Sequence, residues 1–306
     1  MDKKRIFVFL AFTFGIGYAV QFGLLFGGLI AYQDPTIFHT LLLVAVLWIP
    51  ALGALVTSRV CPDPDHPMPG VWPLPAGPAL RLVVAVPMLF AVNYALSWLL
   101  GFAGPQWGLS TLMGSFDPGA LEQIPPNVLP IIPVVLLVIG IPLTVLLGAT
   151  VIAAAALGSE LGWRGYLLPR LAGGNRIVVG IVMGLLWGAW FMPLVIWWFR
   201  FTDDYAGLVP TVLCSLGMAV ALGAALNEIV LRTGHVGLAA LALGLFVSQE
   251  RMGLAFWPYL FPSAELPWAG ACSVFAIALW LLAAACPFLL IGRAARGAAG
   301  AGEGKG

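Results

Sequence analysis

Eight long apolar segments run through the chain, and each is close to the length that a helix needs to cross a bilayer. A bilayer core about 30 Å thick requires roughly 20 consecutive apolar residues in a helix. The segments lie at about residues 6–31, 37–60, 79–103, 129–157, 176–200, 207–231, 235–257 and 268–292. The sequence therefore predicts an all-α fold, a polytopic membrane bundle of about eight transmembrane helices.

Composition supports the same class. The 306 residues are 61% hydrophobic and 9% charged, whereas a soluble domain carries about 25% charge. The lipid bilayer is thus the first expected partner. A net charge of +1 offers no basic patch, so nucleic acid is excluded as a partner. The four cysteines are scattered without a Cys-x-x-Cys pair, which argues against disulfides and zinc thiolate sites.

The placement of lysine and arginine predicts the orientation. If the amino terminus lies inside, only Arg200 and Arg251 of the 14 Lys and Arg residues fall on the outer side. Cytoplasmic loops carry the excess of these residues, and the bias requires an even number of spans. We therefore expect a multi-pass protein of a bacterial inner membrane with both termini cytoplasmic. Residues 1–296 form one transmembrane domain, the Gly/Ala-rich tail 297–306 is disordered, and the proline-rich segment 61–78 is an ordered cytoplasmic loop.

One stretch places two charges inside an apolar span. Residues 158–171 read GSELGWRGYLLPRL, with Glu160 and Arg164 four residues apart. Residues at this spacing share one face of a helix and can pair. A charge near the bilayer centre costs about 2.5–3.5 kcal/mol on insertion scales, so the pair is a candidate functional site.

The stretch resembles the first motif of the CPBP family, the CAAX proteases and bacteriocin-processing enzymes of membranes. That motif is Glu-Glu-x-x-x-Arg, usually extended as Gly-Trp-Arg-Gly-Tyr-Leu-x-Pro, and it matches from Glu160 to Pro169. Residues 184–194, GLLWGAWFMPL, resemble the family's Trp-Gly-x-Trp-His-x-Pro at Trp187, Trp190 and Pro193. A third likeness, at residues 232–234, precedes the last catalytic helix of the family. The resemblance implies a CAAX-protease-like core at about residues 129–257.

The chain departs from the family at the positions that carry the chemistry. In active members the first Glu and two His activate a water for attack on a peptide bond, and an Asn or Asp stabilises the oxyanion. Those positions hold Ser159, Phe191, Leu243 and Val247. None supplies a base at neutral pH. After the first motif the chain has one histidine, His235, and Ala239 stands four residues later, so a shift of register does not restore the set.

The retained residues have two interpretations. Glu160 and Arg164 are either a residual functional pair or a structural ion pair that braces two helices, and the structural interpretation is favoured because the other family residues are missing. Trp163, Trp187 and Trp190 are either core aromatics or substrate clamps, with the core favoured. We expect neither a metal nor a cofactor.

Three functions from different classes remain. The first is a member of the CPBP family without peptidase activity that acts as a membrane binding or accessory protein, with another membrane protein or a lipidated peptide as partner. The second is an active intramembrane endopeptidase with a non-standard site. The third is a small-molecule transporter, which the lack of corresponding Gly/Pro breaks in paired spans disfavours.

Overall fold

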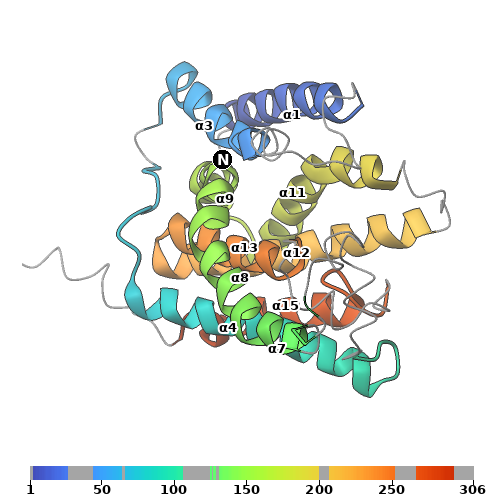
Figure 1. Cartoon of the computed structure of the whole chain (residues 1–306). Helices are drawn as coiled ribbons and strands as arrows, with labels where there is room; N and C mark the ends of the chain where they lie inside the picture. Colours follow the sequence, from blue (N-terminus) through green and yellow to red (C-terminus); the bar gives the residue numbers. More distant parts are fainter. Residues whose placement is uncertain are drawn as a thin grey trace, which may run out of the picture.

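The chain folds into a bundle of helices, seen in a computed structural model that describes residues 3–26, 44–63, 66–105, 125, 127–128, 131–199, 207–251 and 267–292 (Figure 1). Apart from one isolated bridge, the regular elements within these ranges are helical. They are α1 (Lys3–Phe26), α3 (Ile49–Val60), α4 (Ala76–Leu99), α7 (Ile132–Val135), η2 (Leu136–Gly140), α8 (Ile141–Leu147), η3 (Gly148–Ile152), α9 (Ala153–Glu160), η4 (Leu161–Leu167), α10 (Leu168–Leu171), α11 (Arg176–Phe199), α12 (Leu208–Thr233), α13 (Val236–Arg251), α15 (Val274–Ala285) and α16 (Phe288–Ile291).

The structure confirms an all-α polytopic membrane bundle. Five stretches of helix in the described part are long and apolar enough to cross a membrane, and three shorter apolar helices match the remaining predicted spans. The five are Lys3–Leu25, Ala76–Leu99, Val138–Leu171, Arg176–Ile196 and Leu208–Thr233, and the shorter ones are Val44–Val60, Val236–Gln249 and Val274–Ala285. Residues 293–306, with the predicted tail, lie outside the described residues, and the cytoplasmic placement of the termini stays a prediction.

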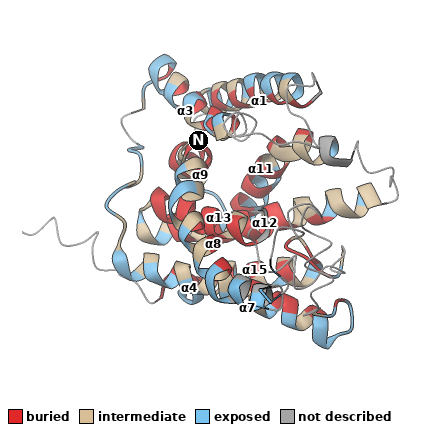
Figure 2. Ribbon diagram, in the orientation of Figure 1, coloured by how far each residue is buried: buried red, intermediate tan, exposed pale blue. Residues whose placement is uncertain are grey.

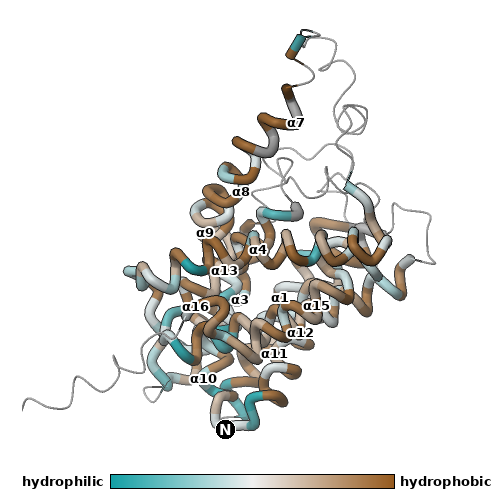
Figure 3. Tube along the Cα trace, turned by 90° about the horizontal axis from the view of Figure 1, so that it is seen from below, coloured by the Kyte–Doolittle hydropathy of each residue, from teal (hydrophilic) through white to brown (hydrophobic). Residues whose placement is uncertain are grey.

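The fourth span is one continuous helix of 34 residues, from Val138 to Leu171. The helix therefore runs past the predicted end of this span at residue 157 and includes both Glu160 and Arg164. Three wider π-helical segments interrupt it, η2, η3 and η4, and the last carries the first motif. The α7 end, which precedes this helix, extends away from the other helices, whereas α8 packs against α13 (Figure 3).

Glycines let the central helices approach closely. A Cβ on Gly184 of α11 would lie 2.4 Å from the Cα of Val220 on α12. A Cβ on Gly244 of α13 would lie 2.4 Å from the carbonyl oxygen of Gly148 on η3. In lipid, helix association depends on close packing rather than on the hydrophobic effect, so small residues gather at such crossings. The first crossing joins α11 to α12, and the second joins α13 to the fourth span.

A proline in α11 explains how α1 attaches to the bundle. Pro193 has no N–H, so the carbonyl of Ala189, four residues earlier, has no helical donor. The Tyr18 hydroxyl donates to that carbonyl at 2.6 Å. One turn along α1, the Gln21 amide donates to the Trp190 carbonyl at 3.1 Å. Tyr18 thus satisfies the carbonyl that the proline leaves open, and Gln21 binds the next carbonyl of α11.

The outside of the bundle is apolar. On α4, Leu80, Val84 and Met88 recur at helical spacing and are 68%, 57% and 55% exposed. Figure 2 shows such exposed and intermediate residues along the outer faces, with buried residues gathered where α9, α11, α12 and α13 meet. An apolar exterior around a buried centre is the arrangement of a bundle in a lipid bilayer.

Candidate functional site

The two charges of the first motif form an ion pair in the centre of the bundle. Glu160 ends α9 and Arg164 lies one turn later in η4, and Nη1 of Arg164 is 3.0 Å from Oε1 of Glu160. Both side chains are fully buried. The predicted pairing on one face is thus present in the structure. Burying one of these charges without the other would carry a large desolvation free energy, and pairing the two charges lowers it.

Arg164 also connects the fourth span to two further helices. Its Nε donates to Oδ1 of Asn227 on α12 at 3.2 Å. Its guanidinium lies over the ring of Trp187 on α11, 4.6 Å from the centroid. Gly223 makes room for it, because a Cβ there would lie 3.2 Å from Nη2. The guanidinium therefore joins η4, α11 and α12.

Several polar atoms around this pair lack a partner among the residues that the structure describes. Glu160 contributes Oε2 and Arg164 contributes Nη2, and Asn227 contributes Nδ2. The indole N–H group of Trp187 is likewise buried without an acceptor. The polar cluster is defined here as Glu160, Arg164, Asn227 and Trp187, which are joined by the guanidinium of Arg164. Three of its four unpartnered groups are donors, so it could satisfy a ligand that carries hydrogen-bond acceptors.

The aromatic residues of the motifs pack against one another. Trp163 meets Phe9 of α1 edge-on at 5.8 Å and Trp190 at 6.5 Å between ring centroids. The indole of Trp190 donates to the Thr13 carbonyl at 3.3 Å. Phe191 lies edge-on to Trp190 at 4.9 Å and to Trp187 at 5.5 Å. These contacts have the geometry of core aromatics.

The four positions expected from the resemblance to correspond to the family's reacting groups are packed into the core. Ser159 is fully buried, and its hydroxyl has no partner among the described residues. Leu243 is buried on α13, while Phe191 and Val247 are half-buried and pack against the hydrophobic core. The structure thus has apolar carbon at three of the positions and a hydroxyl at the fourth.

A metal ion of the kind bound by histidine and carboxylate does not fit this set. The four positions supply one hydroxyl and neither an imidazole nor a carboxylate, the groups that transition metals prefer. Within the described ranges, three side chains of His, Cys, Asp or Glu come together nowhere. Glu160 is the one carboxylate in the polar cluster, and it faces a guanidinium.

Asn227 is the member of the polar cluster that the motifs do not identify. It is a buried amide in the middle of an apolar stretch of α12. A polar residue inside a span usually faces the protein interior and finds a partner there. The sequence therefore shows that Asn227 is a polar residue inside a span. It does not show that the partner is Arg164, 63 residues away.

A second group of charges lies where α1, the segment after α3 and α10 meet. The Asp63 carboxylate is 2.9 Å from Arg170, 3.2 Å from Arg5 and 3.0 Å from His66. Arg170 also lies over the Tyr166 ring, 3.6 Å from its centroid. Burial alone would raise the pKa of Asp63, but Arg170, His66 and Arg5 together hold that pKa below its usual value of 3.8. We call the side of the bundle that holds this group the basic end.

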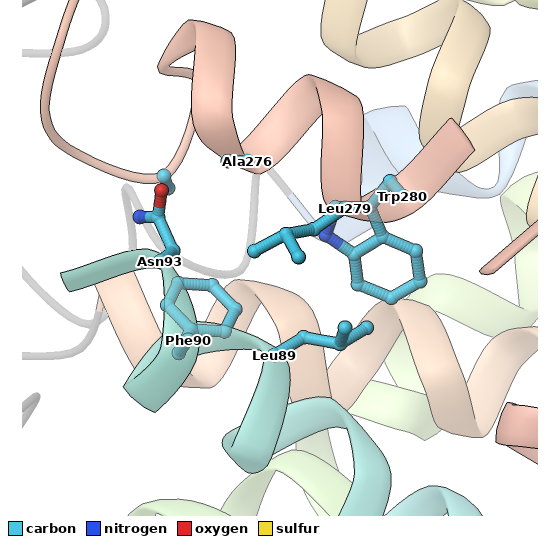
Figure 4. Close-up of a pocket in the computed structure, with 7 residues that line it drawn as sticks. Leu89, Phe90, Asn93, Ala276, Leu279 and Trp280 are labelled. Carbon is cyan, nitrogen blue, oxygen red and sulfur yellow. The ribbon is translucent and has the colours of Figure 1, made fainter. Parts of the chain in front are cut away.

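A small pocket lies between α4 and α15, and its lining residues belong to none of the three motifs. Figure 4 shows Leu89 and Phe90 of α4 facing Leu279 and Trp280 of α15. Asn93 at its margin donates to the Gly270 carbonyl at 3.1 Å and accepts from Ser273 at 2.9 Å. Asn93 therefore fastens the start of α15 to α4.

Comparison with known proteins gives one match. Residues 131–248 match the family model described as type II CAAX prenyl endopeptidase, Rce1-like. The matched range begins near the start of the fourth span and ends in α13, so it contains all three motifs and the polar cluster. No curated protein and no solved structure matches the chain.

Proposed function

We propose that this membrane protein, which belongs to the CPBP family of CAAX proteases by its core at residues 131–248, does not cleave peptides by the family mechanism and instead binds a ligand. The ligand is a lipidated peptide or the membrane segment of another protein. The observation that carries this proposal is the composition of the site. By the motif resemblance, Phe191 and Leu243 stand where active members carry imidazoles, and Ser159 stands where they carry a carboxylate.

Hydrolysis of a peptide bond needs a base within hydrogen-bond reach of the attacking water. Phenylalanine and leucine cannot take up a proton, and serine is a base only after another group has activated it. The group expected to stabilise the oxyanion is replaced by Val247. Losing one oxyanion donor costs about 10²–10³ in turnover, and losing the base costs a further 10²–10⁴ or so.

The polar cluster supports binding. Arg164, Asn227 and Trp187 each carry an unpartnered donor, and the side chains of Asn227 and Trp187 both contact the guanidinium of Arg164. A buried donor without an acceptor costs about 1–3 kcal/mol. A peptide carbonyl or carboxylate that accepted these hydrogen bonds would recover that cost, and an attached lipid chain would remain in the bilayer.

One observation favours a second candidate, a peptidase whose site is rebuilt around Glu160. The Oε2 atom of Glu160 has no partner among the described residues, while Oε1 faces Arg164. A carboxylate oxygen in this state could accept a proton from water. Against it stands the full burial of Glu160 and the absence of an oxyanion donor at Val247.

The two candidates make different predictions for purified protein in lipid nanodiscs. A farnesylated peptide ending in a CAAX sequence is incubated with the protein, and its binding and cleavage are followed by fluorescence anisotropy and mass spectrometry. We expect the peptide to bind and stay intact, and binding to weaken in Arg164→Met. Cleavage that persists in the wild type and disappears in Glu160→Gln would establish the rebuilt site and overturn the proposal.

A further inference from the structure

A proline-rich segment lies against the basic end of the bundle and joins the elements that deliver the polar cluster. We call residues 61–63 and 66–75 the strap, since they connect α3 to α4 along a path that touches α1, η4, α10 and the turn between α12 and α13. Three groups of contacts fix it, one near its start at Asp63, one at Gly70 and one between these two at Met68.

The first anchor is electrostatic. Asp63 pairs with Arg5 of α1 and with Arg170 of α10, and its carboxylate is 3% exposed. Arg5 also donates to the carbonyls of Cys61 and Pro62. One carboxylate thus faces two guanidinium groups and the ring of His66. Removing that carboxylate would take away the counterion that Arg5 and Arg170 share.

The second anchor is a pair of backbone hydrogen bonds at the turn between α12 and α13. The Gly70 amide donates to the Gly234 carbonyl at 2.7 Å, and the Val236 amide donates to the Gly70 carbonyl at 2.8 Å. Gly237 is required for this approach, because a Cβ there would lie 2.3 Å from the Val71 carbonyl oxygen. The turn follows α12, the helix that carries Asn227.

Between the anchors, the strap contacts the first motif at Gly165. A Cβ on Gly165 would lie 3.7 Å from Met68, which is ordinary contact distance. Gly165 directly follows Arg164 in η4 and is itself buried. The strap therefore touches the two elements that supply Arg164 and Asn227, on the side that faces the basic end.

The strap contributes few hydrogen bonds of its own. Pro67, Pro69, Pro73 and Pro75 have no backbone N–H to donate. Met68 and Trp72 are 51% and 79% exposed, while Val71 and Leu74 are partly buried against the core. Segments with few buried contacts open at low free energy. The Asp63 anchor therefore has a large share in keeping the strap in place.

We propose that the strap is a lid over the polar cluster and that the ion pairs of Asp63 hold it closed. In the closed arrangement, Glu160 and Arg164 are fully buried. Loss of the Asp63 contacts releases the strap from α1 and α10 and uncovers η4 at Gly165. As a control on ligand access this rests on the proposed function, whereas the opening itself is measured without any ligand.

The test uses a reporter thiol under the strap. Gly165→Cys is introduced into a chain whose four native cysteines are replaced by serine, and its reaction with a charged maleimide is followed in nanodiscs. We expect slow labelling in this parent and about tenfold faster labelling when Asp63→Asn is added, a change of about 1.4 kcal/mol in the opening equilibrium. Asp63→Glu should stay close to the parent.

Glu228→Gln is the matched control. It also removes a carboxylate near the α12–α13 turn, but its ion pairs in the described residues are with Arg176 and Arg232, outside the strap. Labelling in this variant should equal that of the parent. Equal rates in the parent and in Asp63→Asn would overturn the lid, and they would leave the proposed binding function untouched.

A second measurement does not depend on the folding of Asp63→Asn. In the cysteine-free chain, Met68→Cys and Gly165→Cys place two thiols where the closed strap meets η4. Mild oxidation should join them and protect both from the maleimide, and reduction should restore slow labelling of the Gly165→Cys thiol, whereas the Met68→Cys thiol at its half-exposed position reacts readily. Failure of the crosslink to form, or rapid labelling of the Gly165→Cys thiol before oxidation, would contradict a closed strap at this position.

Discussion

Removing one charge of the buried pair should cost more stability than removing both. Arg164→Met takes away the guanidinium and leaves Glu160 as a buried carboxylate without its cation. Breaking a buried pair in this way costs about 3–5 kcal/mol. The variant also loses the bond to Asn227, and a hydrogen bond to a charged group is worth about 1.5–3 kcal/mol.

The double variant Glu160→Gln/Arg164→Met isolates the electrostatic part. It lacks the uncompensated carboxylate, and what it still loses is the contact of Arg164 with Asn227 and Trp187. We expect its free energy of unfolding to lie about 1–3 kcal/mol below that of the wild type, and thus above that of Arg164→Met. The non-additivity should be about 2 kcal/mol or more, because the two side chains are in direct contact.

The assay is reversible unfolding in mixed micelles, with the denaturing detergent fraction varied and tryptophan fluorescence as the signal. Glu228→Gln/Arg232→Met serves as a matched control, since this pair has the same spacing and is partly exposed. An exposed pair contributes about 0–1 kcal/mol, so its single and double variants should nearly add. If Glu160→Gln/Arg164→Met unfolds as easily as Arg164→Met alone, the pair is not buried and the reasoning fails.

Four further predictions concern the attachment of α1, the packing of α13, the ion pairs of Asp63 and the membrane topology. Tyr18→Phe should cost about 1 kcal/mol in the same unfolding assay, and less in a Pro193→Ala background, where a restored amide bonds the Ala189 carbonyl; an equal cost in both backgrounds would contradict the role given to the proline. Gly244→Ala should prevent close packing of α13 and lower the yield of folded protein in a size-exclusion assay, whereas alanine in place of Gly173, which has open space around it, should leave the yield unchanged. The pKa of Asp63 is lowered in the fold, so its contribution to stability is complete above the usual value of 3.8 and disappears as pH falls through the lowered value; a pH titration of unfolding should show this acid-side loss in the wild type and not in Asp63→Asn. Reporter fusions at both termini should read as cytoplasmic, and an outside signal at either end would refute the topology.

The sequence predicted those parts of the fold that depend on local patterns. The lengths of the apolar runs located the helices, and the four-residue spacing of Glu160 and Arg164 was enough to predict their ion pair. The π-helical turns were not predictable, since they arise from how the fourth span packs and bends rather than from its composition. The family motifs likewise located the site, and the chain matches the corresponding family model over them.

Contacts between distant segments could not be read from spacing. Asn227 is separated by 63 residues from its partner Arg164. The sequence predicted an ordered loop at residues 61–78, but it gave no sign that Asp63 pairs with Arg170. Both contacts join segments that only the folded chain brings together, and each involves a polar residue with several possible partners of equal plausibility. The types of residue were visible, and their pairing was not.

Losing a charge of the retained pair and introducing a polar group at the other motif positions would affect the stability of the fold in different ways. Glu160 and Arg164 offset each other's charge, so loss of either would leave a buried charge without its partner. A carboxylate at the position of Ser159, or an imidazole at Phe191, would instead need partners that the apolar surroundings do not provide. Stability alone can therefore maintain the Glu-x-x-x-Arg part of the motif, whether or not a chain carries the reacting groups. The presence of that pair is thus no evidence of peptidase activity, which must be inferred from the residues at the other positions of the motifs.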